Sequence, residues 1–222
     1  DVLHIHPETP QKRLINQAVE ILRQGGVIVY PTDSAYAIGC HLGDKPASDR
    51  IKRIRRLDEK HNFTLVCRDL SDIGVYAKVD NTQYRLLKTF TPGPYTFILN
   101  ATTEVPRRLL HPKRRSIGVR VPDNAIVQAL LGELGEPIMS STLILPGDTE
   151  PMTDPYDIRE TLESFGGGFQ DLPAMRGLGV GVSILPRSSV LPVLRAGWGI
   201  WNDQVKSCVV ADRSYLGRRG AA

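Results

Sequence analysis

The stretch GGVIVYPTDSAYAIGC, residues 25–40, is the part of the chain from which its fold can be predicted most directly. Gly25 and Gly26 precede the apolar run Val27–Tyr30, which is too short for a helix and is apolar on both faces. Such a run is typical of an interior strand. The polar turn Pro31–Ser34 and a second apolar run at 36–40 follow. Hydroxyls and a carboxylate at the end of a buried strand suit a small ligand, although turns of this composition are also common without one.

A basic helix is expected directly after this stretch. Ala47, Ile51, Ile54 and Leu57 recur at a spacing of three or four residues, which predicts one apolar helical stripe. Between them lie cationic side chains, including Arg53 and Arg55, which are two residues apart and therefore point about 200° from each other on a continuous helix. They can converge on one ligand only if the helix ends near Ile54. Otherwise they border the core as two separate surface cations.

The remaining pattern alternates strands and helices. Apolar runs at 63–67, 95–99, 117–121 and 138–145 read as strands, the last as a strand or loop. Helices are expected from a Thr9 cap to Gly25, from an Asp80 cap to about residue 90, from an Asn124 cap to Gly135, and at 155–165. This order predicts a layered α/β fold with a partly parallel sheet. Beyond Gly166 the periodicity weakens.

Composition narrows the class of protein. The chain has 222 residues, of which 41% are hydrophobic, as expected for a globular protein. Its formal net charge of +4 favours an anionic partner. Its three cysteines are scattered and none shares metal-ligand spacing with a histidine, so neither a disulfide framework nor a metal site is expected. No apolar run approaches the length of about 20 residues needed to cross a membrane. The expected location is the cytoplasm.

Two further groups of residues are candidates for binding anions. Ser140, Ser141 and Thr142 place three hydroxyls in a row within an otherwise apolar segment. A second basic cluster follows residue 106, and such clusters occur both as solvated surface and as RNA-binding patches that contact phosphates without reading sequence. No DNA sequence specificity is therefore expected. The candidate RNA-binding residues are Arg50, Lys52, Arg56, Arg107, Arg108, Lys113, Arg114 and Arg115.

Three motifs in order resemble the YrdC family, most closely its YciO branch. They are residues 25–40, TPGPYTFIL at 91–99 and IGVRVP at 117–122. The likeness covers about residues 14–162, with a divergent part at 166–222, and implies one YrdC-like domain over residues 1–222. It also implies a twisted, mostly parallel or mixed sheet flanked by helices, with a concave basic surface.

The resemblance implies a function in tRNA modification. The family's best understood activity converts L-threonine, bicarbonate and ATP, with Mg²⁺, to threonylcarbamoyl-AMP and pyrophosphate for threonylcarbamoyladenosine in tRNA. The expectation is a protein that binds ATP or AMP and L-threonine and has weak or altered synthase activity. The alternative is a non-catalytic protein that binds double-stranded RNA or tRNA. The substrate-binding residues expected from the resemblance and the residue patterns are Thr32, Tyr36, Arg53, Arg55, Asn62, Arg120, Ser140, Ser141, Thr142 and Arg195.

Departures from the family pattern bear on this activity. The family's Lys-x-Arg pair appears here as Arg53-Ile54-Arg55, and Arg differs from Lys in presenting a planar fork of donors. Where the synthases carry Ser-Thr-Ser-Ala-Asn, this chain has Ser-Ser-Thr-Leu-Ile at residues 140–144. Ile144 replaces the Asn and cannot form a side-chain hydrogen bond. One polar contact to a nucleotide is therefore expected to be missing, at a cost of about 1 kcal/mol.

Overall fold

The β2–β3 hairpin lies in the interior of the sheet. A computed structural model describes residues 2–58, 61–110, 115–167, 180–183, 199–202 and 207–210. Strands β2 (Val27–Pro31) and β3 (Tyr36–His41) are antiparallel, and β3 pairs in turn with β7 (Ile138–Thr142). All five residues of β2 are buried, as expected from the unbroken apolar run.

The other strands extend this hairpin into one mixed sheet. The order of the strands is β1-β8-β2-β3-β7-β4-β6-β5-β10-β9. The parallel pairs within the described residues are β1–β8, β2–β8 and β4–β6, and the others are antiparallel. The bounds are β1 Val2–Leu3, β4 Thr64–Val66, β5 Thr96–Asn100, β6 Ser116–Arg120, β8 Val180–Ser183, β9 Gly199–Asn202 and β10 Ser207–Val210. The expected mixed α/β sheet is confirmed.

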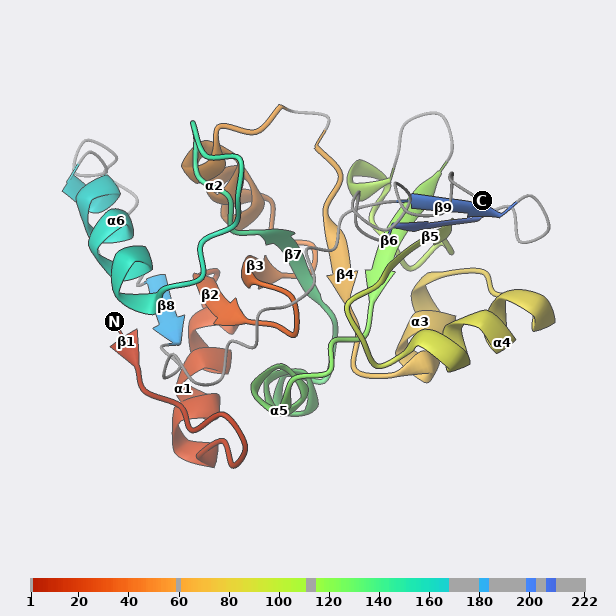
Figure 1. The fold of residues 1–222 in the computed structure, drawn as a ribbon, viewed down its shortest axis with the longest axis horizontal. Coiled ribbons are helices and arrows are strands. Elements are labelled where there is room, and N and C mark those ends of the chain that lie inside the picture. Colours follow the sequence, from red (N-terminus) through yellow and green to blue (C-terminus); the bar gives the residue numbers. More distant parts are fainter. Residues whose placement is uncertain are drawn as a thin grey trace, which may run out of the picture.

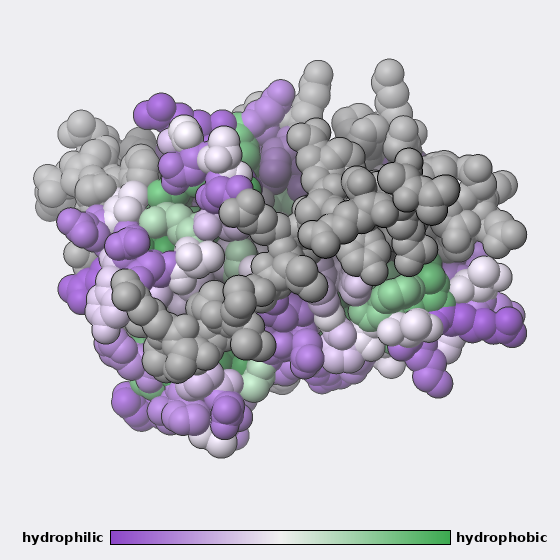
Figure 2. All heavy atoms as spheres, in the orientation of Figure 1, coloured by the Kyte–Doolittle hydropathy of each residue, from purple (hydrophilic) through white to green (hydrophobic). Residues whose placement is uncertain are grey.

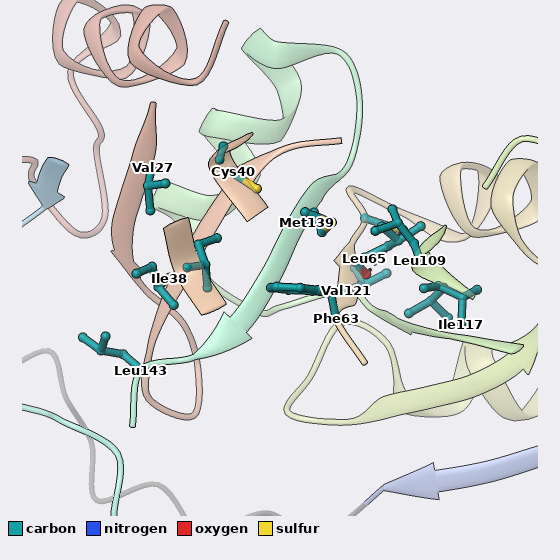
Figure 3. Packing of buried hydrophobic residues seen from close by; sticks show 14 of the residues in the cluster. Val27, Ile38, Cys40, Phe63, Leu65, Leu109, Ile117, Val121, Met139 and Leu143 are labelled. Atoms are coloured by element: carbon teal, nitrogen blue, oxygen red, sulfur yellow. Dashed lines mark hydrogen bonds between the residues drawn. The ribbon is translucent and has the colours of Figure 1, made fainter. Parts of the chain in front are cut away.

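Helices cover the sheet on both faces (Figure 1). Helices α1 (Lys12–Arg23) and α5 (Ala125–Leu134) pack on one face, against the side chains of Ile28 and Tyr30 from β2. Helix α2 (Lys45–Arg55) packs on the other face, where residues of β3, β4, β6 and β7 form the larger core cluster (Figure 3). The further helices are α3 Leu70–Tyr76, α4 Asn81–Phe90, the 3-10 turn η1 Arg107–Leu109 and α6 Pro155–Gly167.

Hydrophilic residues predominate on the surface around α1, and a hydrophobic patch reaches the surface near α3 and α4 (Figure 2). Val75 of α3 and Phe90 of α4 are exposed. None of the described helices is both long and apolar enough to cross a membrane.

Local capping rules place several helix ends correctly. Asp80 forms a capping box with Gln83, Asn124 accepts two backbone N–H groups at the start of α5, and Gly135 ends α5 in the left-handed region. The expected cap at Thr9 is wrong, because α1 begins after Gln11 and the Thr9 backbone and hydroxyl both bond the ring of His6. Helix α3 was not expected; it is a short helix of seven residues.

Candidate functional site

Arg55 and Ser141 form the contact around which the candidate site is built. Arg55 is the last residue of α2, and Ser141 lies in β7, 86 residues later. The guanidinium Nη1 donates to Ser141 Oγ, and Nε donates to the backbone carbonyl of Ile144 at 3.0 Å. Burial lowers the pKa of Arg55, although the group stays charged at neutral pH. A half-buried cation and a hydroxyl are thus held together at the end of β7.

Arg53 takes no part in this contact. Helix α2 continues through Arg55, and Arg56 then takes a left-handed conformation, so the chain does not turn between the two arginines. Arg53 is exposed and its Nε donates to the carbonyl of Asp49, one turn back on the same helix. The condition under which both arginines would face one ligand is therefore not met.

The three consecutive hydroxyls of β7 are separated by the alternation of the strand. Ser141 points to the α2 face, whereas Ser140 points to the opposite face and accepts a hydrogen bond of 2.7 Å from the Tyr30 hydroxyl. Burial raises the pKa of Tyr30, so this hydroxyl remains a donor. Thr142 is exposed and lies opposite Ala37 at the end of the strand. Only Ser141 among the three meets Arg55.

Arg120 belongs to a second cluster, formed with the β2–β3 turn. Its Nη2 donates to Asp33 Oδ1 and to Ser34 Oγ, the latter at 2.8 Å. Both charged side chains are largely buried, with 13% of Arg120 and 11% of Asp33 exposed. Asp33 also accepts the backbone N–H of Asp123 at 3.0 Å, which joins the turn to the start of α5. The cation expected to contact substrate is thus already paired with a carboxylate of the chain itself.

Thr32 and Tyr36 bound the same turn. The Thr32 hydroxyl donates to the carbonyl of Ala35 at 2.6 Å and accepts from the backbone N–H groups of Ser34 and Ala35. Tyr36 is buried, and its carbonyl accepts from the backbone of Leu143. Tyr36 begins β3 and Leu143 follows the antiparallel strand β7. This turn and the Arg55–Ser141 contact therefore lie at the same end of these two strands.

Two expected substrate-binding residues remain, Asn62 and Arg195. Asn62 is exposed in the segment before β4, and Arg195 lies outside the described residues. Ile144, which stands where the synthases carry Asn, contributes its backbone carbonyl to Arg55. The side chain at position 144 is therefore free to change without loss of that hydrogen bond.

The expected RNA-binding residues differ in accessibility. Arg50 is only 7% exposed and its Nη2 donates to the carbonyl of Gly25, so it is unsuited to an RNA surface. Arg56, Arg107, Arg108 and Arg115 are exposed, and Lys52 is half-buried. Arg108 donates to the carbonyl of Gly43, which places Arg108 beside the start of α2. Lys113 and Arg114 lie outside the described residues.

Two features of the site region were not found from the sequence. His61 contacts Ser141, with 2.9 Å between Nε2 and Oγ, and could have been found only from its closeness to the basic helix. The second feature is a cavity of about 290 Å³ beside the end of β6. Asp123 lines this cavity and its backbone N–H donates to Asp33, the partner of Arg120. The cavity is lined by Arg68, Asp69, Leu70, Lys88, Thr91, Pro92, Val121, Pro122, Asp123 and Gln128.

The described histidine, cysteine and carboxylate side chains bear on the expectations for metals and thiols. In the part of the chain that the structure describes, no group of three or more His, Cys, Asp and Glu side chains is placed to hold a metal ion. Cys40 and Cys67 are buried free thiols, and burial raises the pKa of Cys40 to about 12. These two cysteines are therefore protonated components of the core.

A protein-family model agrees with this arrangement of motifs. The model Sua5_yciO_yrdC, described as "Telomere recombination", matches residues 20–166. The chain belongs to the Sua5/YciO/YrdC family. It is 61% identical over 160 residues to the Escherichia coli (strain K12) protein YciO, covering 72% of this chain and 78% of that protein. The crystal structure of E. coli YciO aligns with a TM-score of 0.73 and 54% identity over 82% of each chain.

More distant members of the family carry a named activity. A threonylcarbamoyl-AMP synthase of Vibrio vulnificus (strain YJ016) is 30% identical over 142 residues, 63% of this chain and 76% of that protein. Sua5 of P. abyssi, solved in complex with L-threonine, aligns with a TM-score of 0.68 and 21% identity over 82% of this chain and 50% of that one. At this identity the second likeness shows the fold alone. The YciO branch expected from the motifs is confirmed, because E. coli YciO is about twice as identical to this chain as the Vibrio synthase.

Proposed function

We propose that the chain binds ATP or AMP at the Arg55–Ser141 contact and carries out a weak or altered form of threonylcarbamoyl-AMP synthesis. The observation that carries the proposal is the meeting of Arg55, from the basic helix, with Ser141, from the hydroxyl-rich strand. A guanidinium and a hydroxyl fixed side by side can donate to the oxygens of one phosphate. The relation to proteins named threonylcarbamoyl-AMP synthase supports the choice of nucleotide.

A small amino acid, L-threonine, would bind at the neighbouring turn. The turn at residues 32–35 supplies hydroxyls, and Arg120 supplies a cation for a carboxylate. Because Asp33 already pairs with Arg120, the carboxylate of threonine has to compete with that of Asp33. We expect this competition to weaken threonine binding, which is one physical reason for the proposed low activity.

The chemistry at Arg55 is mainly electrostatic. Threonine and bicarbonate form a carbamate with loss of water, and an oxygen of this carbamate attacks the α-phosphorus of ATP. The bond from that phosphorus to pyrophosphate breaks, so negative charge increases on the leaving phosphates. A fixed cation stabilises that charge. The described side chains do not form a carboxylate cage for Mg²⁺, so the ion would enter with the phosphates of ATP.

Pyrophosphate release and calorimetry test the proposal together. The expected result is slow release of pyrophosphate that requires both threonine and bicarbonate, accompanied by measurable ATP binding. Binding without release would leave a nucleotide-binding protein and remove the synthase assignment. Neither binding nor release would overturn the proposal.

RNA binding is a second proposed function, favoured by one contact. The hydrogen bond from Arg108 to the carbonyl of Gly43 brings this exposed cation beside the beginning of α2, which carries the exposed Lys45. Lys and Arg side chains in such a region neutralise phosphates, and affinity then falls steeply with salt. Filter binding of tRNA and duplex RNA at increasing salt tests this. RNA retention that does not depend on salt, or its absence at physiological salt, would contradict it.

A further inference from the structure

His61 is held against the proposed phosphate site by contacts on several sides. Its Nε2 lies 2.9 Å from Ser141 Oγ, and its backbone N–H donates to the carbonyl of Asp58 at 2.9 Å. The imidazole meets the ring of Phe63 edge-on, with 5.5 Å between ring centroids and an angle of 90° between the planes. The position of the ring is thus fixed before any ligand arrives.

The donors around Ser141 determine the state of this imidazole. The guanidinium of Arg55 can only donate, so Ser141 Oγ is the acceptor in that contact. The hydroxyl of Ser141 can then donate a hydrogen bond to His61 Nε2. Nε2 accepts this hydrogen bond when the ring is neutral and carries its own proton on Nδ1. We assign this tautomer from the hydrogen-bond pattern.

The charges near His61 favour the same neutral form. Burial lowers the pKa of His61, and the positive charges of Arg55 and Lys52 on α2 lower it further. Among the described residues, the ring contacts the uncharged side chains of Ser141 from β7 and Phe63 from the following segment. A bound phosphate dianion would offset the two cations and make protonation of the ring more favourable.

We propose that His61 takes up a proton when a phosphate group binds beside Arg55, so that its Nε2 changes from an acceptor for Ser141 into a third donor to the anion. This inference rests on the proposed nucleotide site and adds a pH dependence to it. Since linkage is reciprocal, protonation of His61 strengthens phosphate binding by the same factor as phosphate binding favours protonation.

The direction of the pH dependence follows from this linkage. Affinity for the dianion is lowest above the His61 pKa of the complex and rises as pH falls toward the His61 pKa of the free protein, which lies below the ordinary value of 6.5. Each unit by which the anion raises the His61 pKa corresponds to about tenfold in affinity. His61 is therefore a phosphate-binding residue whose contribution to affinity is large in mild acid and small in alkali.

Calorimetric titration with AMP in buffers of different ionisation enthalpy measures the proton uptake directly. The wild-type chain is expected to take up a fraction of a proton at pH 7 that exceeds the uptake of His61→Gln, because a Gln amide can bond Ser141 but does not titrate in this range. The phosphate of AMP itself titrates near pH 6 and contributes equally to both proteins. His41→Gln is the matched control, because His41 pairs with Glu136 instead of Ser141, and it is expected to behave as wild type.

Nuclear magnetic resonance measures the protonation of His61 in the unaltered protein, and a variant is needed only to assign its signal. The chain has five histidines, and the His61 signal is the one lost in His61→Gln. Its pKa is expected to rise when AMP is added. If AMP binds while the His61 pKa stays fixed and His61→Gln shows the same proton uptake as wild type, the inference is wrong and the nucleotide site stands. If AMP does not bind at all, both fail.

Discussion

At the scale of single residues, the pairing of Arg120 with Asp33 is the contact that most alters the expectation drawn from the motifs. Arg120 was expected to face substrate, but it is largely buried and paired with a residue of the PTDS turn. Its Nε is buried with no hydrogen-bond partner among the described residues. A buried guanidinium depends strongly on its remaining acceptors.

Asp33→Asn is expected to lower the free energy of unfolding by roughly 3–5 kcal/mol, because it leaves the charge of Arg120 buried without a counter-charge. Urea denaturation measures the change. Asp49→Asn is the control, since the Lys45–Asp49 pair is exposed and is expected to contribute less than about 1 kcal/mol. Equal losses in the two variants would contradict the importance given to burial.

Ile144→Asn is expected to strengthen AMP binding by roughly fivefold, which corresponds to one neutral hydrogen bond. The backbone carbonyl of residue 144 continues to hold Arg55, so the variant adds a donor without removing the existing contact. Calorimetry compares it with Ile144→Leu, which stays apolar and is expected to bind as wild type. Unchanged or weaker binding by the Asn variant would show that position 144 does not face the nucleotide.

At the scale of elements, capping residues could be read from the sequence, whereas the direction of functional side chains could not. Asp80, Asn124 and Gly135 act through neighbours within four residues, so local rules find them. The separation of Arg53 from Arg55 depends on where α2 ends, and the separation of Ser140 from Ser141 depends on how β7 sits in the sheet. These features are set by tertiary packing, which a motif does not specify.

Gly39 marks a close approach between strands at the centre of the sheet. A Cβ at this position would lie 2.7 Å from Ile138 Cγ2 and 3.0 Å from Tyr30 Cε1. Gly39→Ala is therefore expected to lower the free energy of unfolding by about 1–3 kcal/mol through overpacking. Thermal and urea denaturation measure the effect.

Gly132→Ala serves as the comparison for this substitution. Gly132 lies within α5, and apart from its chain neighbours and the backbone of its own helix no atom lies within 4 Å of an added Cβ, so alanine is expected to stabilise the helix by about 0.5–1 kcal/mol. A stabilised Gly39→Ala variant, or a destabilised Gly132→Ala variant, would contradict the packing described for the sheet and for α5.

At the scale of the whole molecule, the fold class and the family follow from the sequence, and the shape of the site follows only from the structure. The motifs at residues 25–40, 91–99 and 117–122 were sufficient to predict a mixed α/β sheet of the YrdC type. The site joins residues 55, 61, 141 and 144, which are up to 89 positions apart. His61 lies near these residues because the segment before β4 runs beside the end of β7. The sequence motifs do not specify this pairing of β4 with β7.

The measurement that tests the central claim most directly is titration of ATP into Arg55→Gln and Arg53→Gln, with thermal denaturation to confirm that both variants are folded. Arg55 meets Ser141, whereas Arg53 is exposed and bonds its own helix. Loss of a charged hydrogen bond costs about 1.5–3 kcal/mol, so Arg55→Gln is predicted to weaken ATP binding roughly 10- to 100-fold. Arg53→Gln is predicted to leave it nearly unchanged. Equal weakening in both variants, or none in Arg55→Gln, would contradict the account.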